Sequence, residues 1–191
     1  MNEEYAIVLD FLPQGKSSSF KSEPVGIAIG TAFFTLLELV PKTSIELKPM
    51  EKVYIGKDSR EKIDHIKQRI RFDDLTTSSR SELEKAIDQI VLENEKKFVQ
   101  FFNNAGSISL KRHQLELLPS IGKNHLDDII KARGQKPFDS FKDIDDRIKF
   151  ISNPLVIIRR RILNELEEKD KYYLFVRPPQ VDDQTRKSRF R

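Results

Sequence analysis

The stretch Pro119–His125 is the part of the sequence whose residue types and spacing best suit the binding of an anion. A turn that contains proline, serine and isoleucine ends at Gly122, and a helix is predicted from Lys123 onward. The free N–H groups at a helix start, together with the positive end of the helix dipole, can bind a phosphate without contacting a base. Gly122 allows the backbone to come close, Lys123 adds a positive charge, and Asn124 and His125 can donate hydrogen bonds.

Two segments around this turn resemble paired helix-hairpin-helix modules. Residues 115–130 are similar to the family pattern Leu-Pro-Gly-Ile-Gly followed by spaced apolar positions. Residues 137–144, Pro-Phe-Asp-Ser-Phe-Lys-Asp-Ile, resemble the Phe-x-Ser/Thr-Phe-x-Asp-Leu stretch of such modules in bacterial competence DNA-uptake proteins. The resemblance implies that the turn contacts the backbone of a nucleic acid. The alternative is that the same turn merely connects two helices or contacts a protein.

Ser120 departs from this pattern, because the family usually has glycine at that position. If the position requires a positive φ, serine costs about 1 kcal/mol there. The resemblance also implies a monovalent cation held by the backbone carbonyls of Glu116, Leu118 and Ile121. Residues 147–154 occupy the place of a second hairpin but contain no glycine, so we expect a degenerate hairpin that does not bind phosphate in the same way.

Three consecutive arginines lie on the last predicted helix. Arg159 falls within its apolar face, which predicts an ion pair with Asp145 or Asp146. Arg160 and Arg161 flank that face and are candidates for phosphate contact. The complete set of predicted nucleic-acid-binding residues is Ser120, Ile121, Gly122, Lys123, Asn124, His125, Arg160 and Arg161.

Motifs of common enzyme classes are absent from the sequence. It has no Walker loop, no Gly-x-Gly-x-x-Gly, no His-Glu-x-x-His and no Gly-x-Ser-x-Gly. Four adjacent acidic pairs could in principle hold Mg²⁺ for a nuclease, but neighbouring residues on a helix point apart. The lack of cysteine excludes disulfides, thiolate zinc sites and iron–sulfur ligation. We therefore expect a protein that is not an enzyme and that has no cofactor or metal.

The charge distribution also favours a polyanionic partner for the C-terminal part. The chain carries 34 Lys+Arg and 30 Asp+Glu, a net charge of +4. Residues 1–106 have 15 basic and 17 acidic side chains, whereas residues 107–191 have 19 basic and 13 acidic ones. The basic excess thus lies entirely in the second half, as nucleic-acid binding would require. A solvated basic surface is the alternative.

The ends and apolar runs of the chain predict a protein of the cytoplasm. The first residues do not combine a basic segment with an apolar one, so no signal peptide is predicted. The longest apolar stretch, Val25–Val40, is too short to span a bilayer and is interrupted by glycine, threonine and glutamate. We expect no interaction with a membrane.

The N-terminal residues 1–75 predict a small domain of short strands. Apolar runs of strand length alternate with turn residues, and a tight hairpin is expected at Gly30-Thr31. Residues 63–72 fit either a strand or a helix. Four or five strands in this length suggest a small closed barrel of OB-like or SH3-like type. The predicted strands are Tyr5–Leu12, Val25–Ile29, Phe33–Val40, Met50–Ile55 and Ile63–Phe72.

The remaining residues predict mainly helices. Residues 76–106 form a connecting segment whose amphipathic helix starts at a Ser79-x-x-Glu82 capping box and runs from about Arg80 to Asn103. Residues 107–169 form a helical domain, with its first helix capped by Ser109. Residues 170–179 contain a strand, Tyr172–Val176, which we expect to return to the barrel because a lone strand needs a partner. Residues 180–191 are predicted to be a disordered basic tail.

The order of these pieces resembles an archaeal family that carries the label domain of unknown function 655. The resemblance covers nearly all of residues 3–179. It implies an N-terminal OB-like barrel followed by a helix-hairpin-helix region, and a protein that binds nucleic acid. Such barrels bind single strands through exposed aromatics, for which Phe33, Phe34, Tyr54 and Phe72 are candidates. The segments that carry the resemblance are Tyr5–Phe11, Ile27–Thr31, Phe33–Glu38, Val53–Lys57, Phe101–Gly106 and Tyr172–Pro178.

The sequence thus predicts an α+β protein that is a non-enzymatic binder of nucleic acid, with RNA slightly favoured over DNA. The predicted partner is the phosphate backbone of RNA or DNA. The alternative function is that of a protein–protein adaptor in the translation or transcription machinery.

Overall fold

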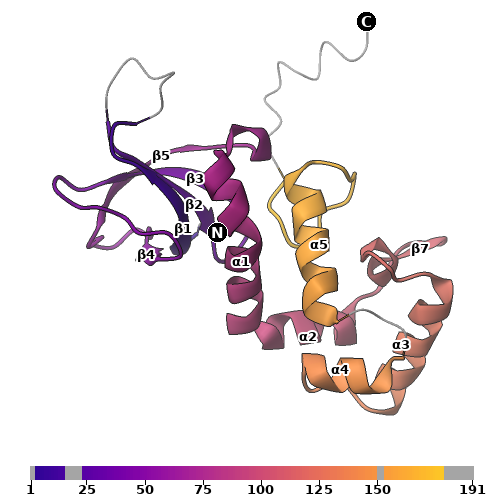
Figure 1. The fold of residues 1–191 in the computed structure, drawn as a ribbon. Coiled ribbons are helices and arrows are strands. Elements are labelled where there is room, and N and C mark those ends of the chain that lie inside the picture. The colour runs from indigo at the N-terminus through magenta and orange to yellow at the C-terminus, as the bar shows by residue number, and fades with distance from the viewer. Residues whose placement is uncertain (1–2, 16–22, 150–152, 179–191) are drawn as a thin grey trace, which may run out of the picture.

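The computed structural model describes residues 3–15, 23–149 and 153–178. The tail predicted over residues 180–191 and the middle of the segment expected to form a second hairpin lie outside these residues. The chain forms a curled antiparallel sheet on one side and a group of helices on the other, with α1 (Thr77–Glu93) and α5 (Pro154–Leu166) between them (Figure 1). Within the described residues, no helix combines the length and the apolar character needed to cross a membrane.

Five strands in the order β4-β1-β2-β3-β5 make up the sheet, and all neighbours are antiparallel. The sheet is a half-barrel, because β4 pairs only with β1, β5 pairs only with β3, and no pairing between β4 and β5 closes it in the described part. The ambiguous segment from residue 63 forms a strand, which stops at Arg69. The strands are β1 (Tyr5–Leu12), β2 (Val25–Gly30), β3 (Leu36–Pro41), β4 (Lys52–Tyr54) and β5 (Ile63–Arg69).

Strand alternation divides the apolar side chains of the sheet between two cores. Ile7 and Leu9 of β1 pack in the cluster that includes the buried residues of the helices, whereas Ala6 and Val8 lie in a second cluster with β3 and β4 side chains. One face of the sheet is therefore covered by α1, and the other face fills the hollow of the half-barrel.

The loop between β2 and β3 is longer than the predicted tight hairpin, since it occupies residues 31–35. Glu3 organises it: its buried carboxylate accepts hydrogen bonds from the backbone N–H groups of Ala32 (2.8 Å), Phe33 (3.1 Å) and Thr35 (3.2 Å). The carboxylate lies where a side chain at Gly30 would be, so any larger residue there would displace Glu3 from these hydrogen bonds.

The connecting segment consists of two helices rather than one, α1 (Thr77–Glu93) and α2 (Glu95–Asn104), which meet at Asn94. The cap of α1 is Thr76, whose hydroxyl accepts from the N–H of Ser79 at 3.0 Å, so the helix begins earlier than the predicted Ser79 box. The helix predicted after Ser109 is replaced by a small hairpin and a 3₁₀ helix. These elements are β6 (Ser107–Ser109), β7 (Arg112–His113) and η2 (Gln114–Leu117).

The last helices are α3 (Lys123–Gln135), α4 (Phe141–Arg147) and α5 (Pro154–Leu166). The strand predicted at residues 172–176 is not formed. Instead, this segment runs over α5 because the buried carboxylate of Glu165 accepts the N–H groups of Leu174, Phe175 and Val176 at 2.8–2.9 Å. The segment reaches the loop between β2 and β3, where the Arg177 N–H donates to the Phe33 carbonyl at 3.1 Å, but it adds no strand to the sheet, so the expected pairing with the sheet is wrong.

Candidate nucleic-acid interface

The turn before α3 combines a left-handed residue with a helix start that no side chain caps. Ser120 has φ +69°, in the left-handed region that glycine usually occupies. Gly122 is the N-cap of α3, and no side chain caps its N–H groups. A side chain built at Gly122 would meet no atom within 4 Å, so the approach to the helix start is open. The position at which the sequence lacks the family's glycine is therefore the one at which serine is strained.

Buried side chains hold this turn in place from below. Ile121 and Leu118 are 5% and 2% exposed. The Ile121 N–H donates to the Leu118 carbonyl at 3.2 Å, and the Leu126 N–H donates to the Gly122 carbonyl at 2.9 Å, which closes the first turn of α3. Ile121 is thus an anchor of the turn, and its side chain is not available to a ligand.

The polar residues of the turn do not all face outward. The side chains of Lys123 and Asn124 are exposed and make no hydrogen bond or ion pair within the described part of the chain. His125 is half-buried, and its Nδ1 donates to the Ser120 carbonyl at 3.0 Å, since a carbonyl can only accept. The exposed Asp127 and Asp128 follow one turn later and oppose an anion. Lys123 and the free N–H groups are accordingly the main attraction for a phosphate.

The three arginines of α5 have three different environments. Arg159 pairs with Asp88 at 2.5 Å and with Glu84 at 3.6 Å, both on α1, rather than with Asp145 or Asp146. Arg160 is exposed, so its side chain is accessible from solvent.

Arg161 is the clear correction among the predicted site residues, because it is 2% exposed and cannot reach an external phosphate. Its Nε donates to Glu165 at 2.7 Å and its Nη1 to the Leu117 carbonyl at 2.9 Å. Nη1 also pairs with Asp170, and Nη2 donates to the Tyr172 carbonyl. Arg161 therefore joins α5 to the C-terminal segment and to the residues just before the turn.

A buried histidine that sequence reasoning missed supports the turn from η2. His113 is 8% exposed; its N–H donates to Glu116 Oε2 at 2.7 Å, and its Nδ1 accepts from Leu115 N–H at 3.1 Å. Burial, reinforced by the positive charge of Arg133, lowers the pKa of His113. The neutral ring is the form that can accept at Nδ1. The His-x-x-Glu spacing of this capping box was the sequence signal for it.

The aromatic candidates of the sheet are mostly occupied by neighbours. Phe34 is 1% exposed and belongs to the core. Phe33 lies against the guanidinium of Arg177, and Phe72 against that of Arg80, at 5.6 and 5.0 Å from the ring centres. Tyr54 packs edge-on against Tyr5. The described residues contain no cluster of three or more metal-ligating side chains.

Comparison with known proteins gives a consistent family assignment. The family model for DUF655, described as a protein of unknown function, matches residues 2–177. An uncharacterized protein of Methanocaldococcus jannaschii is 44% identical over 177 residues, which are 92% of this chain and 80% of that protein. A crystal structure of a DUF655 protein from Archaeoglobus fulgidus is similar with a TM-score of 0.84 and 41% identity, covering 92% of this chain and all of the other. The chain therefore belongs to the DUF655 family.

Proposed function

We propose that the protein is a non-enzymatic nucleic-acid-binding protein whose turn at residues 119–125 holds a backbone phosphate. The observation that carries this proposal is the combination of left-handed Ser120, the uncapped start of α3 and exposed Lys123 at one point of the surface. These groups offer N–H donors, a dipole and a charge, none of which reads sequence. Exposed Arg160 is proposed as an additional phosphate contact.

RNA is the preferred ligand in this proposal because the half-barrel has the size and curl of small barrels that bind single strands, which we propose to be its OB-like character. Nonetheless, a backbone phosphate is common to RNA and DNA. The choice between them is therefore left to the binding experiment, with a single-stranded RNA, a structured RNA and a DNA duplex compared at equal salt.

The test is fluorescence anisotropy over a salt series with wild type, Lys123→Glu and the matched control Lys131→Glu. Lys131 lies on the same helix, is exposed, and is about 12 Å along the helix axis from Lys123. We expect Lys123→Glu to weaken binding about tenfold for every sequence and to lower the salt slope by about one unit. The control should change affinity less than threefold.

Equal losses in both variants would refute a localised site and indicate diffuse attraction to a basic surface. Absence of binding at low salt would instead favour the second candidate, a protein–protein adaptor. One observation supports that candidate: Leu110, at the tip of the β6–β7 hairpin, is fully exposed. An adaptor should co-purify with a protein after nuclease treatment, and Leu110→Ser should abolish the co-purification.

A further inference from the structure

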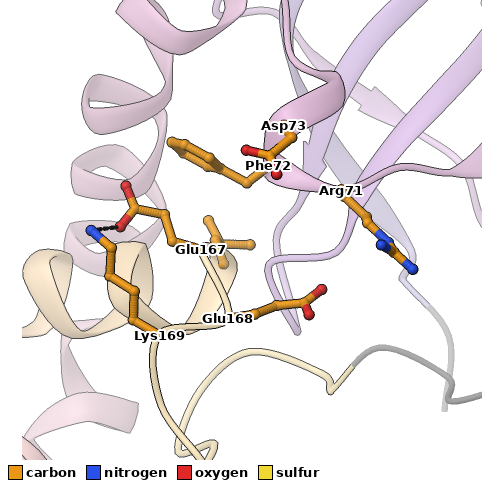
Figure 2. A pocket seen from close by; sticks show the side chains of 7 residues that line it. Arg71, Phe72, Asp73, Glu167, Glu168 and Lys169 are labelled. Atoms are coloured by element: carbon orange, nitrogen blue, oxygen red, sulfur yellow. Dashed lines mark ion pairs between the residues drawn. The ribbon is translucent and has the colours of Figure 1, made fainter. Parts of the chain in front are cut away.

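A cleft lies between the half-barrel and the end of α5, far along the chain from the turn. It consists of two adjoining cavities of about 290 and 330 Å³. Figure 2 shows the larger one: the side chains of Arg71 and Glu168 point to one side, and the ion pair of Glu167 with Lys169 lies on the other. The residues common to both cavities are Arg71, Phe72, Leu166 and Glu168.

The smaller cavity is the one with the positive charge. Arg69, Arg71 and Arg177 all line it, and no ion pair joins any of them to a carboxylate within the described residues. They come from the end of β5, the link after it and the C-terminal segment. Of the two carboxylates at this cavity, Glu168 is exposed, whereas Glu165 is buried and already binds Arg161 and three backbone N–H groups.

The larger cavity has the opposite balance, since Asp73, Glu167 and Glu168 outnumber Arg71 and Lys169 there. An anion is therefore directed to the smaller cavity. Unpaired arginines that converge from two distant parts of the chain are typical of phosphate recognition, because the guanidinium fork matches two phosphate oxygens at once.

An unsatisfied hydroxyl lies in the same place. Thr35 lines the smaller cavity and is 9% exposed, and its Oγ1 has no hydrogen-bond partner among the described residues. Buried polar atoms without a partner are rare in folded proteins, and each calls for a ligand, a water or an ion. A ligand oxygen in this cavity would supply the missing partner.

Aromatic side chains border the arginines. Phe72 and Tyr173 both line the smaller cavity and are half-buried. The protonated phenol of Tyr173, whose pKa is raised further by burial, can donate a hydrogen bond. An aromatic face beside a phosphate site is the arrangement that stacks a base. Arg177 is itself held in position by its stacking on Phe33.

We propose that this cleft binds a nucleotide, with its phosphate held by Arg69, Arg71 and Arg177 and its base against Tyr173. The phosphate could belong to a free nucleotide or to a single strand that passes over the half-barrel. The site is separate from the turn before α3 and does not depend on it.

The test is isothermal titration calorimetry with AMP and with the trinucleotide r(AAA). Arg69→Gln and Arg177→Gln should each weaken AMP binding at least tenfold, because each removes a charge-assisted contact. The matched control is Lys57→Gln, which removes one charge from an exposed residue that lines neither cavity. It should change affinity less than twofold.

A second variant separates binding from folding. Thr35→Val is nearly isosteric and removes the unpaired hydroxyl, so it should weaken AMP about fivefold while leaving the melting temperature unchanged or higher. AMP affinity equal to that of r(AAA) would identify a free nucleotide as the ligand, and tighter binding of r(AAA) would identify a single strand.

Failure of wild type to bind either probe at millimolar concentration, or arginine variants that bind as wild type does, would overturn the proposal. The turn before α3 is tested separately by Lys123→Glu on long strands. Either proposal can therefore fail while the other stands.

Discussion

Replacement of Arg161 by methionine tests whether one buried guanidinium holds the C-terminal segment against α5. Arg161 and Glu165 are side by side on α5 and are 2% and 1% exposed. Methionine preserves most of the side-chain volume but removes every donor. The buried carboxylate of Glu165 then loses its positive partner, and the carbonyls of Leu117 and Tyr172 lose their donor.

The size of the effect follows from the cost of leaving a buried charge without its partner. Removal of one member of a buried ion pair typically costs about 3–5 kcal/mol. Three backbone N–H groups still solvate Glu165, so we expect the lower part of this range. For a chain of this length, about 3 kcal/mol corresponds to a fall in melting temperature of roughly 6–12 °C.

Thermal unfolding followed by circular dichroism at pH 7 measures the loss, with Arg160→Met as the matched control. Arg160 is the exposed neighbour, and its replacement should shift the melting temperature by less than about 2 °C. Hydrogen exchange localises the effect: the amides of Leu174, Phe175 and Val176 should exchange faster in Arg161→Met. Arg161→Lys, which keeps the charge but not the fork, should fall between wild type and methionine.

Two results together would refute this reasoning. One is a melting temperature of Arg161→Met within about 2 °C of wild type, and the other is unchanged exchange of these three amides. The C-terminal segment would then be held by its apolar contacts, and the ion pair would be neutral to stability.

Three further outcomes are expected. Ser120→Gly should relieve the left-handed backbone strain of about 1 kcal/mol, offset in part by the larger entropy of glycine in the unfolded chain. If the turn contacts phosphate, the same change should strengthen binding of long strands in the anisotropy assay, and weaker binding would contradict this. The pKa of His113 is lowered in the folded protein, so the unfolded chain binds more protons at mildly acidic pH. The contribution of His113 to the free energy of unfolding is therefore full above about pH 6.5 and is lost as the pH falls below that value. Urea unfolding should show that the free energy of unfolding falls less between pH 7.5 and pH 5.5 for His113→Asn than for wild type. Glu3→Gln should lower the free energy of unfolding by roughly 1–3 kcal/mol in urea, because a single amide oxygen replaces the carboxylate that accepts three N–H groups of the loop between β2 and β3. An unchanged free energy of unfolding would show that packing alone holds the loop.

The sequence by itself determined the features that depend on neighbouring residues. The turn at residues 119–122 and the helix from Lys123 follow from local turn chemistry, and both are present. The apolar runs at residues 25–41 form β2 and β3, because alternation and turn residues act over short distances. The sequence indicated that serine replaces the usual glycine at position 120 of the turn. Only the structure showed that Ser120 has φ +69° and is therefore strained.

Errors at helix ends also have a local cause. The helix start was predicted at Ser79, although Thr76 is an equally good cap residue. In the structure the Thr76 hydroxyl accepts from the Ser79 N–H at 3.0 Å and also donates to Asp10 of β1 at 2.5 Å. A contact with a distant strand therefore chose between two equal signals. The break between α1 and α2 at Asn94 could not be predicted, because the apolar periodicity of the sequence continues through both helices.

Only the tertiary structure determined that Arg161 is buried rather than exposed. A helical wheel places Arg161 beside the apolar face, where an arginine with a glutamate four residues later usually faces solvent. The C-terminal segment folds over this side of α5, so the pair is buried, and that coverage depends on residues 170–176 rather than on the helix. The cleft beside β5 arises in the same way, because its arginines come from segments more than 100 residues apart whose proximity no local pattern encodes.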